Sequence, residues 1–224
     1  MLPHVILHNI VSLDGRMDWF MPDIGLFYEI VSFWKEDASL AGSGTILKAL
    51  EHESAGEESI RSSGEKSLEA DKQKPLLIVP DSKGKITKLH LLKKQPYWRD
   101  VIVLGSSLTP RSYLEYLYEN QIEYIISGDD HVDFNSAFEI LNSQYKVKII
   151  RVDSGGILNG VLLRAGLVDE VSILISPSLV GGFSPNSFYR APDLKSTEEV
   201  ISLNLIHFER LREDIIWLRY KVTK

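Results

Sequence analysis

Short apolar runs alternate along the chain with segments whose apolar residues recur every three or four positions. Residues 4–12, 75–81 and 100–105 are apolar runs bounded by turn residues, a pattern typical of buried strands. Residues 23–34 and 132–145 carry the helical spacing of amphipathic segments. Alternation of strands with helices predicts an α/β domain with a mostly parallel sheet, because each helix returns the chain to the same edge.

Residues that favour helix ends support three of the predicted helices. Asp23 precedes the first helix and is a candidate N-cap. Thr109 is expected to cap the helix over 109–121, with Pro110 at its first position. A later helix, in the sequence GILNGVLLRAG, is expected to end at Gly166.

The C-terminal run LNLIHFERLREDIIWLRYKVT, residues 203–223, has a different pattern. Two β-rich stretches flank the sequence REDI. Such a pair, joined by a short polar turn, predicts an antiparallel hairpin at the edge of the sheet. The expected fold class is therefore α/β, with a mostly parallel central sheet and an antiparallel C-terminal hairpin.

Residues 51–74 interrupt the pattern. Glu, Ser, Lys and Gly dominate there and apolar residues nearly vanish. A segment of this composition buries too little apolar surface to fold on its own, so we expect a mobile acidic surface insertion rather than a linker between domains. With 224 residues, 44% of them hydrophobic, the chain is expected to form a single domain over 1–224.

Composition argues against several classes of function. The net charge of −6 and the lack of a basic run argue against nucleic-acid binding. The chain has no cysteine and its six histidines are scattered, so we expect no disulfide and no metal site. No apolar run reaches the roughly 18 residues of a membrane helix, and the apolar start reads as a strand rather than a signal peptide. We therefore expect a cytoplasmic protein with no membrane partner.

Three polar or glycine-rich turns follow predicted strands. They are AGSGT at 41–45, PDSKGK at 80–85 and DSGGILNG at 153–160. In parallel sheets, ligands bind outside the carboxyl ends of the strands, where glycine backbones and helix N-termini offer N–H groups to an anion. Together the turns indicate a phosphate-bearing ligand, while each alone is also compatible with a structural turn. The Rossmann fingerprint is absent, since Leu47 stands where its third glycine would fall.

The second of these turns narrows the expected ligand. Ser82 is accompanied by two lysines, Lys83 and Lys85, directly after a strand. A serine with two lysines suits a terminal phosphate group, such as the 2′-phosphate that distinguishes NADP from NAD. A solvated lysine turn is the alternative interpretation.

The stretch VDSGGILNGVLLRAGLVDEVSILISPSLVGG, residues 152–182, resembles the reductase domain of riboflavin biosynthesis, which shares the dihydrofolate reductase fold. In that family a Glu-Gly-Gly turn leads into a helix, followed by GLVDE, a strand, a proline and a second glycine pair. The turns SLDGR at 12–16 and AGSGT at 41–45 are similar to two further turns of the family. The resemblance spans nearly the whole chain and implies a dihydrofolate reductase-like three-layer domain.

The resemblance also implies an activity. It is that of an NADPH-dependent reductase, which converts the ribosyl group of an amino- or diamino-ribosylaminopyrimidine 5′-phosphate to a ribityl group. A homodimer is implied as well. By motif, the implied cofactor contacts are Gly44, Thr45, Ser82, Gly155, Gly156, Ile157, Leu158 and Asn159.

Asp153 stands where the family usually has the glutamate of Glu-Gly-Gly, and the resemblance places it near the substrate. We expect it to orient the substrate or to assist opening of the ribose ring; capping of the following helix is the alternative. Asp14 and Arg16 are further candidates for substrate binding, although Asp14 also suits a role in shaping its turn. Arg16, Lys93 and Lys94 are candidates for the substrate phosphate, and a solvated surface explains each of them equally well.

Two other functions fit the same residues, because Ala49 stands where the family commonly carries an aspartate of the ligand site. A related NADPH reductase of the dihydrofolate reductase fold, acting on a pterin or folate, would take its acid from the first helix. Asp23 and Glu29 are the candidates for that acid. A nucleotide-binding regulatory protein would keep the cofactor turns and lack the substrate site.

Overall fold

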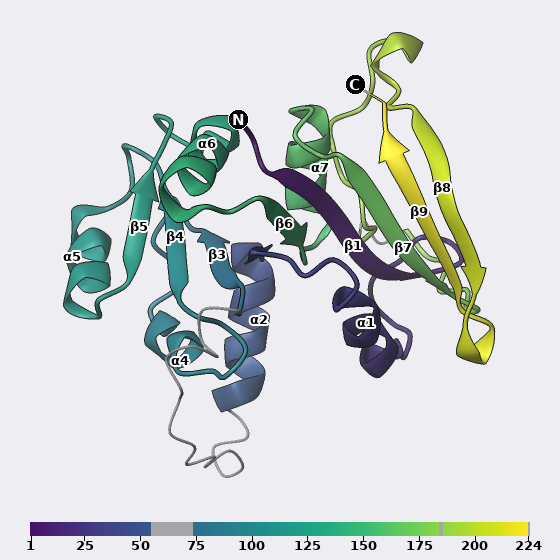
Figure 1. The fold of residues 1–224 in the computed structure, drawn as a ribbon, viewed down its shortest axis with the longest axis horizontal. Helices are drawn as coiled ribbons and strands as arrows, with labels where there is room; N and C mark the ends of the chain where they lie inside the picture. Colours follow the sequence, from purple (N-terminus) through teal and green to yellow (C-terminus); the bar gives the residue numbers. More distant parts are fainter. Residues whose placement is uncertain (55–73, 184–185, 224) are drawn as a thin grey trace. The chain divides into compact units, whose positions relative to one another are not determined.

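The computed structural model of the chain describes residues 1–54, 74–183 and 186–223 (Figure 1). These residues form two compact units. The first unit comprises Met1–Pro3 and Glu36–Lys148, and the second comprises His4–Lys35 and Ile149–Lys224. Of the predicted insertion, residues 51–54 are the end of a helix, and residues 55–73 lie outside the described residues.

Four parallel strands lie in the first unit, in the order β5-β4-β3-β2. They are β2 (Ala38–Leu40), β3 (Leu76–Pro80), β4 (Val101–Gly105) and β5 (Glu123–Ile126). The accompanying helices are α2 (Ser43–Ser54), α4 (Leu89–Lys93), α5 (Arg111–Glu119) and α6 (Phe134–Tyr145). Buried strand residues such as Leu77 and Val103 pack with Ile46, Leu89 and Leu117 of the helices to form the core.

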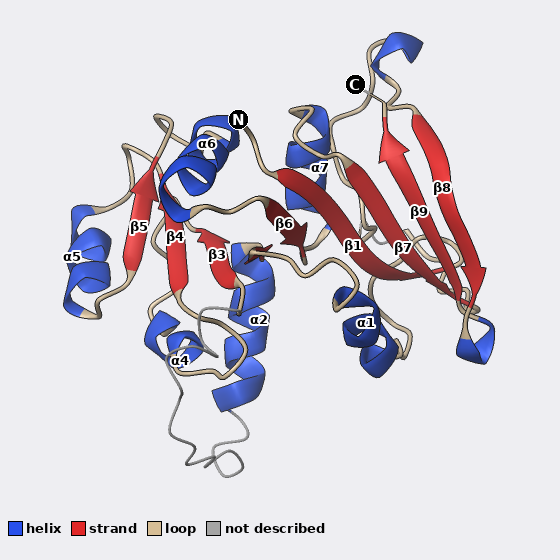
Figure 2. Cartoon of the chain, in the orientation of Figure 1, coloured by secondary structure: helices blue, strands red, loops and turns tan. Residues whose placement is uncertain are grey.

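The second unit has the strand order β6-β1-β7-β9-β8 (Figure 2). Its strands are β1 (His4–Ser12), β6 (Ile149–Val152), β7 (Glu170–Ser176), β8 (Leu203–Arg210) and β9 (Ile216–Val222). Its helices are α1 (Ile24–Val31), α7 (Gly156–Arg164) and the 3₁₀ turns Thr197–Glu199 and Arg212–Asp214. β1 pairs in parallel with β6 and β7, whereas β9 is antiparallel to β7 and to β8. The predicted fold class, with its antiparallel C-terminal hairpin, is confirmed.

The predicted helix ends are confirmed in two cases and wrong in one. Asp23 Oδ1 accepts a hydrogen bond from the Leu26 N–H at 2.8 Å, and Gly166 has a φ of 68° beyond the end of α7. Thr109 does not cap α5, whose N-cap is Pro110. Its hydroxyl instead forms hydrogen bonds that connect the turns after β3 and β4. No helix in the described part of the chain has both the length and the apolar character needed to cross a membrane.

The chain segment after β7 crosses α7 at very short distance. A Cβ atom on Gly156 would lie 2.1 Å from the Ser187 carbonyl oxygen, and one on Gly160 would lie 1.8 Å from that of Arg190. The two glycines are four residues apart, so they lie on one face of the helix. The Arg190 N–H donates to the Gly156 carbonyl at 2.9 Å and fixes the crossing. A side chain at either position would push this segment away.

Asn159 stabilises this crossing through hydrogen bonds in the interior of the second unit. Its side chain is completely buried, and its Nδ2 donates to Asn9 Oδ1 at 2.8 Å and to the Phe188 carbonyl at 2.7 Å. Asn9 Nδ2 in turn donates to the Ser154 carbonyl at 2.9 Å. A buried amide in such a network joins β1, the turn before α7 and the crossing segment, since each bond is made away from water.

His8 lies in the aromatic core of the second unit. Its ring stacks on Phe27 with 4.5 Å between centroids, and its Nδ1 lies 3.0 Å from Ser172 Oγ. The same hydroxyl accepts a hydrogen bond from Trp217 Nε1 at 2.9 Å. Burial disfavours the charged imidazolium and Arg151 adds a positive charge, so the pKa of His8 is lowered to about 3. The core therefore holds this histidine in its neutral form.

Gly160→Ala is expected to destabilise the second unit, because the new Cβ would overlap the Arg190 carbonyl oxygen. Overpacking of this kind costs about 1–3 kcal/mol, and more where the backbone must shift. Gly155→Ala is the matched control, since nothing lies within 4 Å of its Cβ position and its φ of −77° suits alanine. Urea unfolding followed by circular dichroism compares the two variants. Equal stabilities would contradict this account of the crossing.

The protein is also expected to lose stability in acid through His8. The unfolded chain binds a proton there near pH 6.5, while the folded chain does so only near pH 3, so stability falls as the pH drops through this interval. At pH 5 the expected loss is about 2 kcal/mol. His8→Asn removes the titrating ring, so its unfolding free energy should change by about that much less between neutral pH and pH 5. An identical pH dependence in the variant and the parent protein would refute the assignment.

Candidate active site

The turns that follow the parallel strands of the first unit lie along one edge of its sheet. Residues 41–45 follow β2, residues 81–85 follow β3, and residues 106–109 follow β4. Because parallel strands all end at the same edge, these turns form a row there, which is where ligands of open α/β sheets bind. Two of the three predicted glycine-rich turns belong to this row.

Gly44 and Thr45 are accessible in this row. Both are exposed in the first turn of α2, and no atom lies within 4 Å of the position of a Cβ on Gly44. The first N–H groups of a helix have no intrahelical acceptor, so they are available to an anion. The two residues predicted to contact the cofactor from this turn can therefore be reached.

Hydrogen bonds to Asp81 stabilise the turn after β3, and the lysines of this turn are exposed. Asp81 is buried, and its Oδ2 accepts a hydrogen bond from the Ile86 N–H at 2.9 Å. Gly84 has a φ of 62°, which allows its N–H to donate back to the Asp81 carbonyl at 3.1 Å. Lys83 and Lys85 are exposed. The rigid turn thus directs two positive charges outward.

The turn after β4, which was not predicted from the sequence, supports the one after β3. The Thr109 hydroxyl donates to the Ser82 carbonyl at 3.0 Å and accepts from the Ser106 N–H at 2.9 Å. The Ser107 N–H donates to the Gly128 carbonyl at 3.0 Å, in the turn after β5. The only signal in the sequence is the position of these serines directly after an apolar run.

Asp153 follows β6 in the second unit and is held by a buried arginine. Arg151 Nη1 donates to Asp153 Oδ2 at 3.2 Å; the arginine side chain is 2% exposed and the aspartate side chain 33%. The N-cap of α7 is Gly155, and no side chain in the described residues caps this helix. The capping role considered for Asp153 is therefore wrong. Arg151 fixes one oxygen of the carboxylate, and a third of the Asp153 side chain remains exposed.

The five residues predicted to offer their backbone at the start of α7 differ in access. Gly155 has open space around its Cβ position, Ile157 is exposed and Leu158 is half-buried. Gly156 is covered by the crossing segment, and Asn159 is completely buried. Packing against the crossing segment therefore explains why residue 156 is glycine, whereas Gly155 leaves the start of the helix accessible.

The SLDGR turn is bonded to the loop that carries the second glycine pair. Asp14 accepts hydrogen bonds from Ser12 Oγ at 2.6 Å, from the Val180 N–H at 3.1 Å and from the Gly181 N–H at 2.7 Å. These bonds, led by that of Ser12, stabilise the carboxylate and lower the pKa of Asp14 to about 2. The Leu13 N–H also bonds to this loop, so Asp14 shapes the turn, as one of the two interpretations predicted.

Arg16 also connects the SLDGR turn to the loop with the second glycine pair. Its Nη2 donates to the Gly182 carbonyl at 2.6 Å, and its Nε lies 3.9 Å from Asp14 Oδ2. Gly181 and Gly182 have φ values of 68° and 75°, a left-handed conformation that glycine adopts without strain. The second glycine pair is thus explained by backbone conformation. Among the phosphate candidates, Lys93 is engaged by Asp100 at 3.0 Å.

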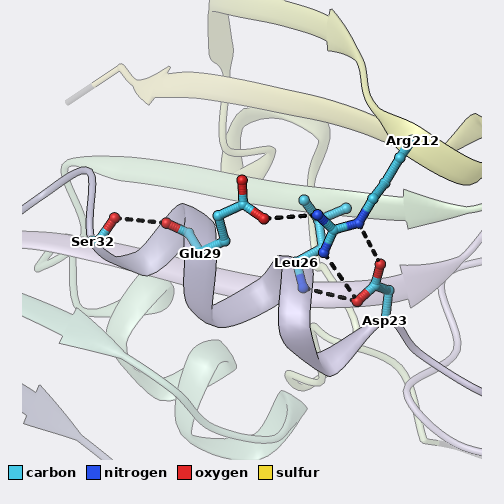
Figure 3. A network of polar contacts seen from close by, with 5 residues as sticks. All are labelled: Asp23, Leu26, Glu29, Ser32 and Arg212. Atoms are coloured by element: carbon cyan, nitrogen blue, oxygen red, sulfur yellow. Dashed lines mark hydrogen bonds and ion pairs between the residues drawn. The ribbon is translucent and has the colours of Figure 1, made fainter.

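The acid required by a folate-type reductase is not available on α1 (Figure 3). Arg212 Nε donates to Asp23 Oδ2 at 2.9 Å, and its Nη1 donates to Glu29 Oε2 at 2.7 Å. The Arg212 guanidinium and the Leu26 N–H lower the pKa of Asp23. Both candidate acids are therefore paired with Arg212, which joins α1 to the β8–β9 turn. This geometry counts against the pterin or folate alternative.

Residues 1–54, 74–183 and 186–223 contain no group of three or more His, Asp or Glu side chains placed to hold a metal ion.

Two curated proteins are similar to this chain over nearly its whole length. Both are named 2,5-diamino-6-ribosylamino-4(3H)-pyrimidinone 5′-phosphate reductase. The protein from Methanothermobacter thermautotrophicus is 25% identical over 222 residues, which cover 96% of this chain and 97% of the relative. The protein from Aquifex aeolicus is 25% identical over 216 residues, covering 93% and 92%.

Solved structures share the fold. A pyrimidine reductase-like protein from Corynebacterium diphtheriae superimposes with a TM-score of 0.73 at 17% identity, covering 99% of this chain and 92% of that one. RibD from Acinetobacter baumannii gives a TM-score of 0.70 at 20% identity. This chain is covered to 99% but spans only 58% of the Acinetobacter protein.

The sequence profile of one protein family covers the strands and turns described above. It is that of the RibD C-terminal domain, and it matches residues 28–217. The match includes Asp153, the start of α7 and the turns of the first unit. By this match over most of its length, the chain belongs to the RibD C-terminal domain family.

Proposed function

We propose that this chain is an NADPH-dependent reductase of riboflavin biosynthesis, which reduces the ribosyl group of an amino- or diamino-ribosylaminopyrimidine 5′-phosphate to a ribityl group. The observation that carries the proposal is the similarity over nearly the whole chain to two reductases named for such a substrate. The half-exposed carboxylate of Asp153 beside an accessible helix start supports it, because both are features of a ligand site.

To reduce the ribosyl group, the protein must mainly orient the substrate; general acid–base catalysis by side chains contributes less. When bound, NADPH supplies the hydride that adds to C1′ of the ring-opened ribosylamine, an imine whose nitrogen gains a proton. Asp153 suits the orienting task, because Arg151 fixes one of its oxygens and the side chain is still 33% exposed. A substrate hydroxyl that donates to this carboxylate would be held in a defined position relative to the turn before α7.

The turn after β3 in the first unit suits the 2′-phosphate of NADPH. Ser82 offers a hydroxyl, and Lys83 and Lys85 are exposed positive charges beside it. The side chains of Asp81 and Thr109 stabilise the turn through hydrogen bonds to main-chain groups. Little of the turn therefore has to become ordered when an anion binds. This supports a preference for NADPH over NADH.

The proposal includes the oligomeric state. The resemblance to the reductase family implies a homodimer, and the exposed apolar side chains of Leu205 and Phe208 on β8 support one.

The purified chain is expected to oxidise NADPH when 2,5-diamino-6-ribosylamino-4(3H)-pyrimidinone 5′-phosphate is added. The rate should exceed that with dihydrofolate, and that with NADH, by at least about tenfold. Loss of the absorbance of the reduced nicotinamide measures it, and rescue of a riboflavin auxotroph that lacks this reductase is the matching test in cells. Binding of NADPH without turnover of any pyrimidine would favour the non-enzymatic alternative.

Asp153→Asn is expected to lower kcat by about 10²-fold, because the orienting anion is lost while the shape of the side chain is kept. The dissociation constant for NADPH, measured by calorimetry, should change less than about twofold. Asp153→Glu restores the residue usual in the family and should retain most of the activity. A normal kcat in Asp153→Asn would remove the role assigned to this carboxylate.

A further inference from the structure

A pocket of about 480 Å³ lies within the second unit, between α7 and the segment that crosses it. The side chains that line it are Ile157, Val161 and Arg164 of the helix and Arg190, Ala191 and Pro192 of the crossing segment. Small-molecule sites in proteins have volumes of roughly 300–1,000 Å³ and combine a mostly apolar lining with a few polar groups. The pocket, which we call the α7 pocket, has both properties.

The α7 pocket follows one stripe of the helix. Ile157, Val161 and Arg164 are spaced four and three residues apart, so their side chains lie one above another. Leu162 and Leu163, which are buried, point to the other side of the helix. Ile157 is 63% exposed and Val161 is 46% exposed. The outward stripe of a surface helix is normally polar, so these branched apolar side chains suit a surface that a ligand covers.

Contacts between main-chain atoms fix the two walls of the pocket. The Arg190 N–H donates to the Gly156 carbonyl at 2.9 Å. Gly160 also lines the pocket, and the Arg190 carbonyl oxygen lies where the Cβ of a larger residue would stand. Because these contacts set the distance between helix and segment, the pocket is formed before a ligand binds, and binding costs little ordering of the chain.

Arg190 brings a positive charge to this pocket. Its side chain packs on the first turn of α7, with Cγ 3.0 Å from the position of a Cβ on Gly156. The residue is exposed, and its guanidinium forms no hydrogen bond or ion pair within residues 1–54, 74–183 and 186–223. All five N–H donors of the guanidinium are therefore available to a ligand as far as this part of the chain is concerned.

Arg164 adds a second positive charge, in the last turn of the helix. Its Nη1 donates to the Glu199 carbonyl at 2.8 Å, and its guanidinium carbon lies 5.7 Å from the centroid of the Tyr189 ring. These contacts fix the side chain without neutralising it. Among the described residues that line the pocket, none is acidic, although the whole chain has a net charge of −6. Two cations without a carboxylate complement an anion.

We propose that the α7 pocket is a binding site for a small organic phosphate with a flat apolar ring. The phosphate pairs with Arg190, because the planar guanidinium matches two phosphate oxygens and a phosphate ester carries up to two negative charges. The ring covers Ile157 and Val161 and removes their apolar surface from water.

The inference does not rest on the proposed function. Asp153 precedes the helix and is not among the residues that line the pocket. A chain that binds an aromatic phosphate here without reducing a pyrimidine would refute the reductase alone.

Binding of 1-naphthyl phosphate tests the ligand chemistry, with 1-naphthol and inorganic phosphate as the compounds that lack one of its two parts. In NMR titrations of the ¹⁵N-labelled chain, 1-naphthyl phosphate should shift the amide signals of residues 157–164 and 190–192 saturably. The expected dissociation constant is roughly 1 mM or lower, and each partial compound should bind at least about tenfold more weakly. The absence of saturable shifts there, or equally tight binding of either partial compound, would overturn the proposal.

Arg190→Ala tests the charge. It is expected to weaken binding of 1-naphthyl phosphate at least about tenfold, since the charge-assisted hydrogen bonds to the phosphate are lost. Lys195→Ala is the matched control, because it removes the same charge from an exposed residue shortly after the pocket-lining ones. The control should change the dissociation constant less than about twofold. Equal effects of the two variants would show that only the general field of the protein attracts the phosphate, and they would overturn the site.

Val161→Glu tests the location, because it places an anion on the apolar stripe and leaves both arginines in place. It should also weaken binding at least about tenfold. Circular dichroism should show the parent spectrum for both pocket variants, since the replaced side chains are largely exposed. Unweakened binding in folded Val161→Glu would refute the location.

The affinity for NADPH separates the pocket from the cofactor site. Arg190→Ala should change the dissociation constant for NADPH less than about twofold. A parallel loss of NADPH and of 1-naphthyl phosphate would assign Arg190 to the cofactor site and overturn a separate pocket.

Discussion

The close passage of one backbone segment over α7 determines the geometry of the second unit's candidate site. Carbonyl oxygens of Ser187 and Arg190 lie where the Cβ atoms of Gly156 and Gly160 would stand, so the segment touches the helix backbone itself. Main-chain contact at this distance leaves almost no freedom of sliding, since every displacement meets another atom. The buried Asn159 then joins the crossing to β1 and to the turn that carries Asp153.

The same segment also reaches the SLDGR turn. Arg16 forms an isolated β-bridge with Ser187, and the Met17 N–H donates to the Asn186 carbonyl at 3.2 Å. A few residues of chain thus contact α7 on one side and the turn after β1 on the other. Asp14 and Arg16, which the sequence offers as candidates for substrate binding, hold this turn to the loop at 178–182. Their effect on a bound substrate would act through the position of that loop.

The α/β class, the C-terminal hairpin and two of three helix ends followed from local patterns, because periodicity and capping depend on residues a few positions apart. The failures involve partners distant in sequence. Thr109 has the chemistry of a cap, yet its hydroxyl bonds to Ser82, 27 residues away. At Gly156, a predicted cofactor contact, the sequence does not reveal that Ser187 packs against the helix. The short helix α4 lacks the length over which an apolar period becomes visible.

Part of the candidate site could be predicted because its location does not depend on contacts between residues distant in sequence. Asp153, Ser82 and the start of α2 were found because the ends of parallel strands are ligand sites in this class of sheet, whatever the contacts between side chains. The pattern gave no indication of which of these residues the fold would leave accessible. That depends on burial, and it separates Gly155 from Gly156 and Asp153 from Asp14.

Arg151 connects the core of the second unit to its candidate chemistry. A guanidinium that is almost completely buried needs an anion, because an unpaired charge in a protein interior is very costly. Asp153 provides one, and it does so from the border of the core, since its side chain is 33% exposed. The same positive charge contributes to keeping His8 neutral. An aspartate, shorter than glutamate, sits closer to its own strand, so the pairing with Arg151 two residues earlier holds the carboxylate at the end of β6 and fixes the direction from which a substrate hydroxyl can approach it.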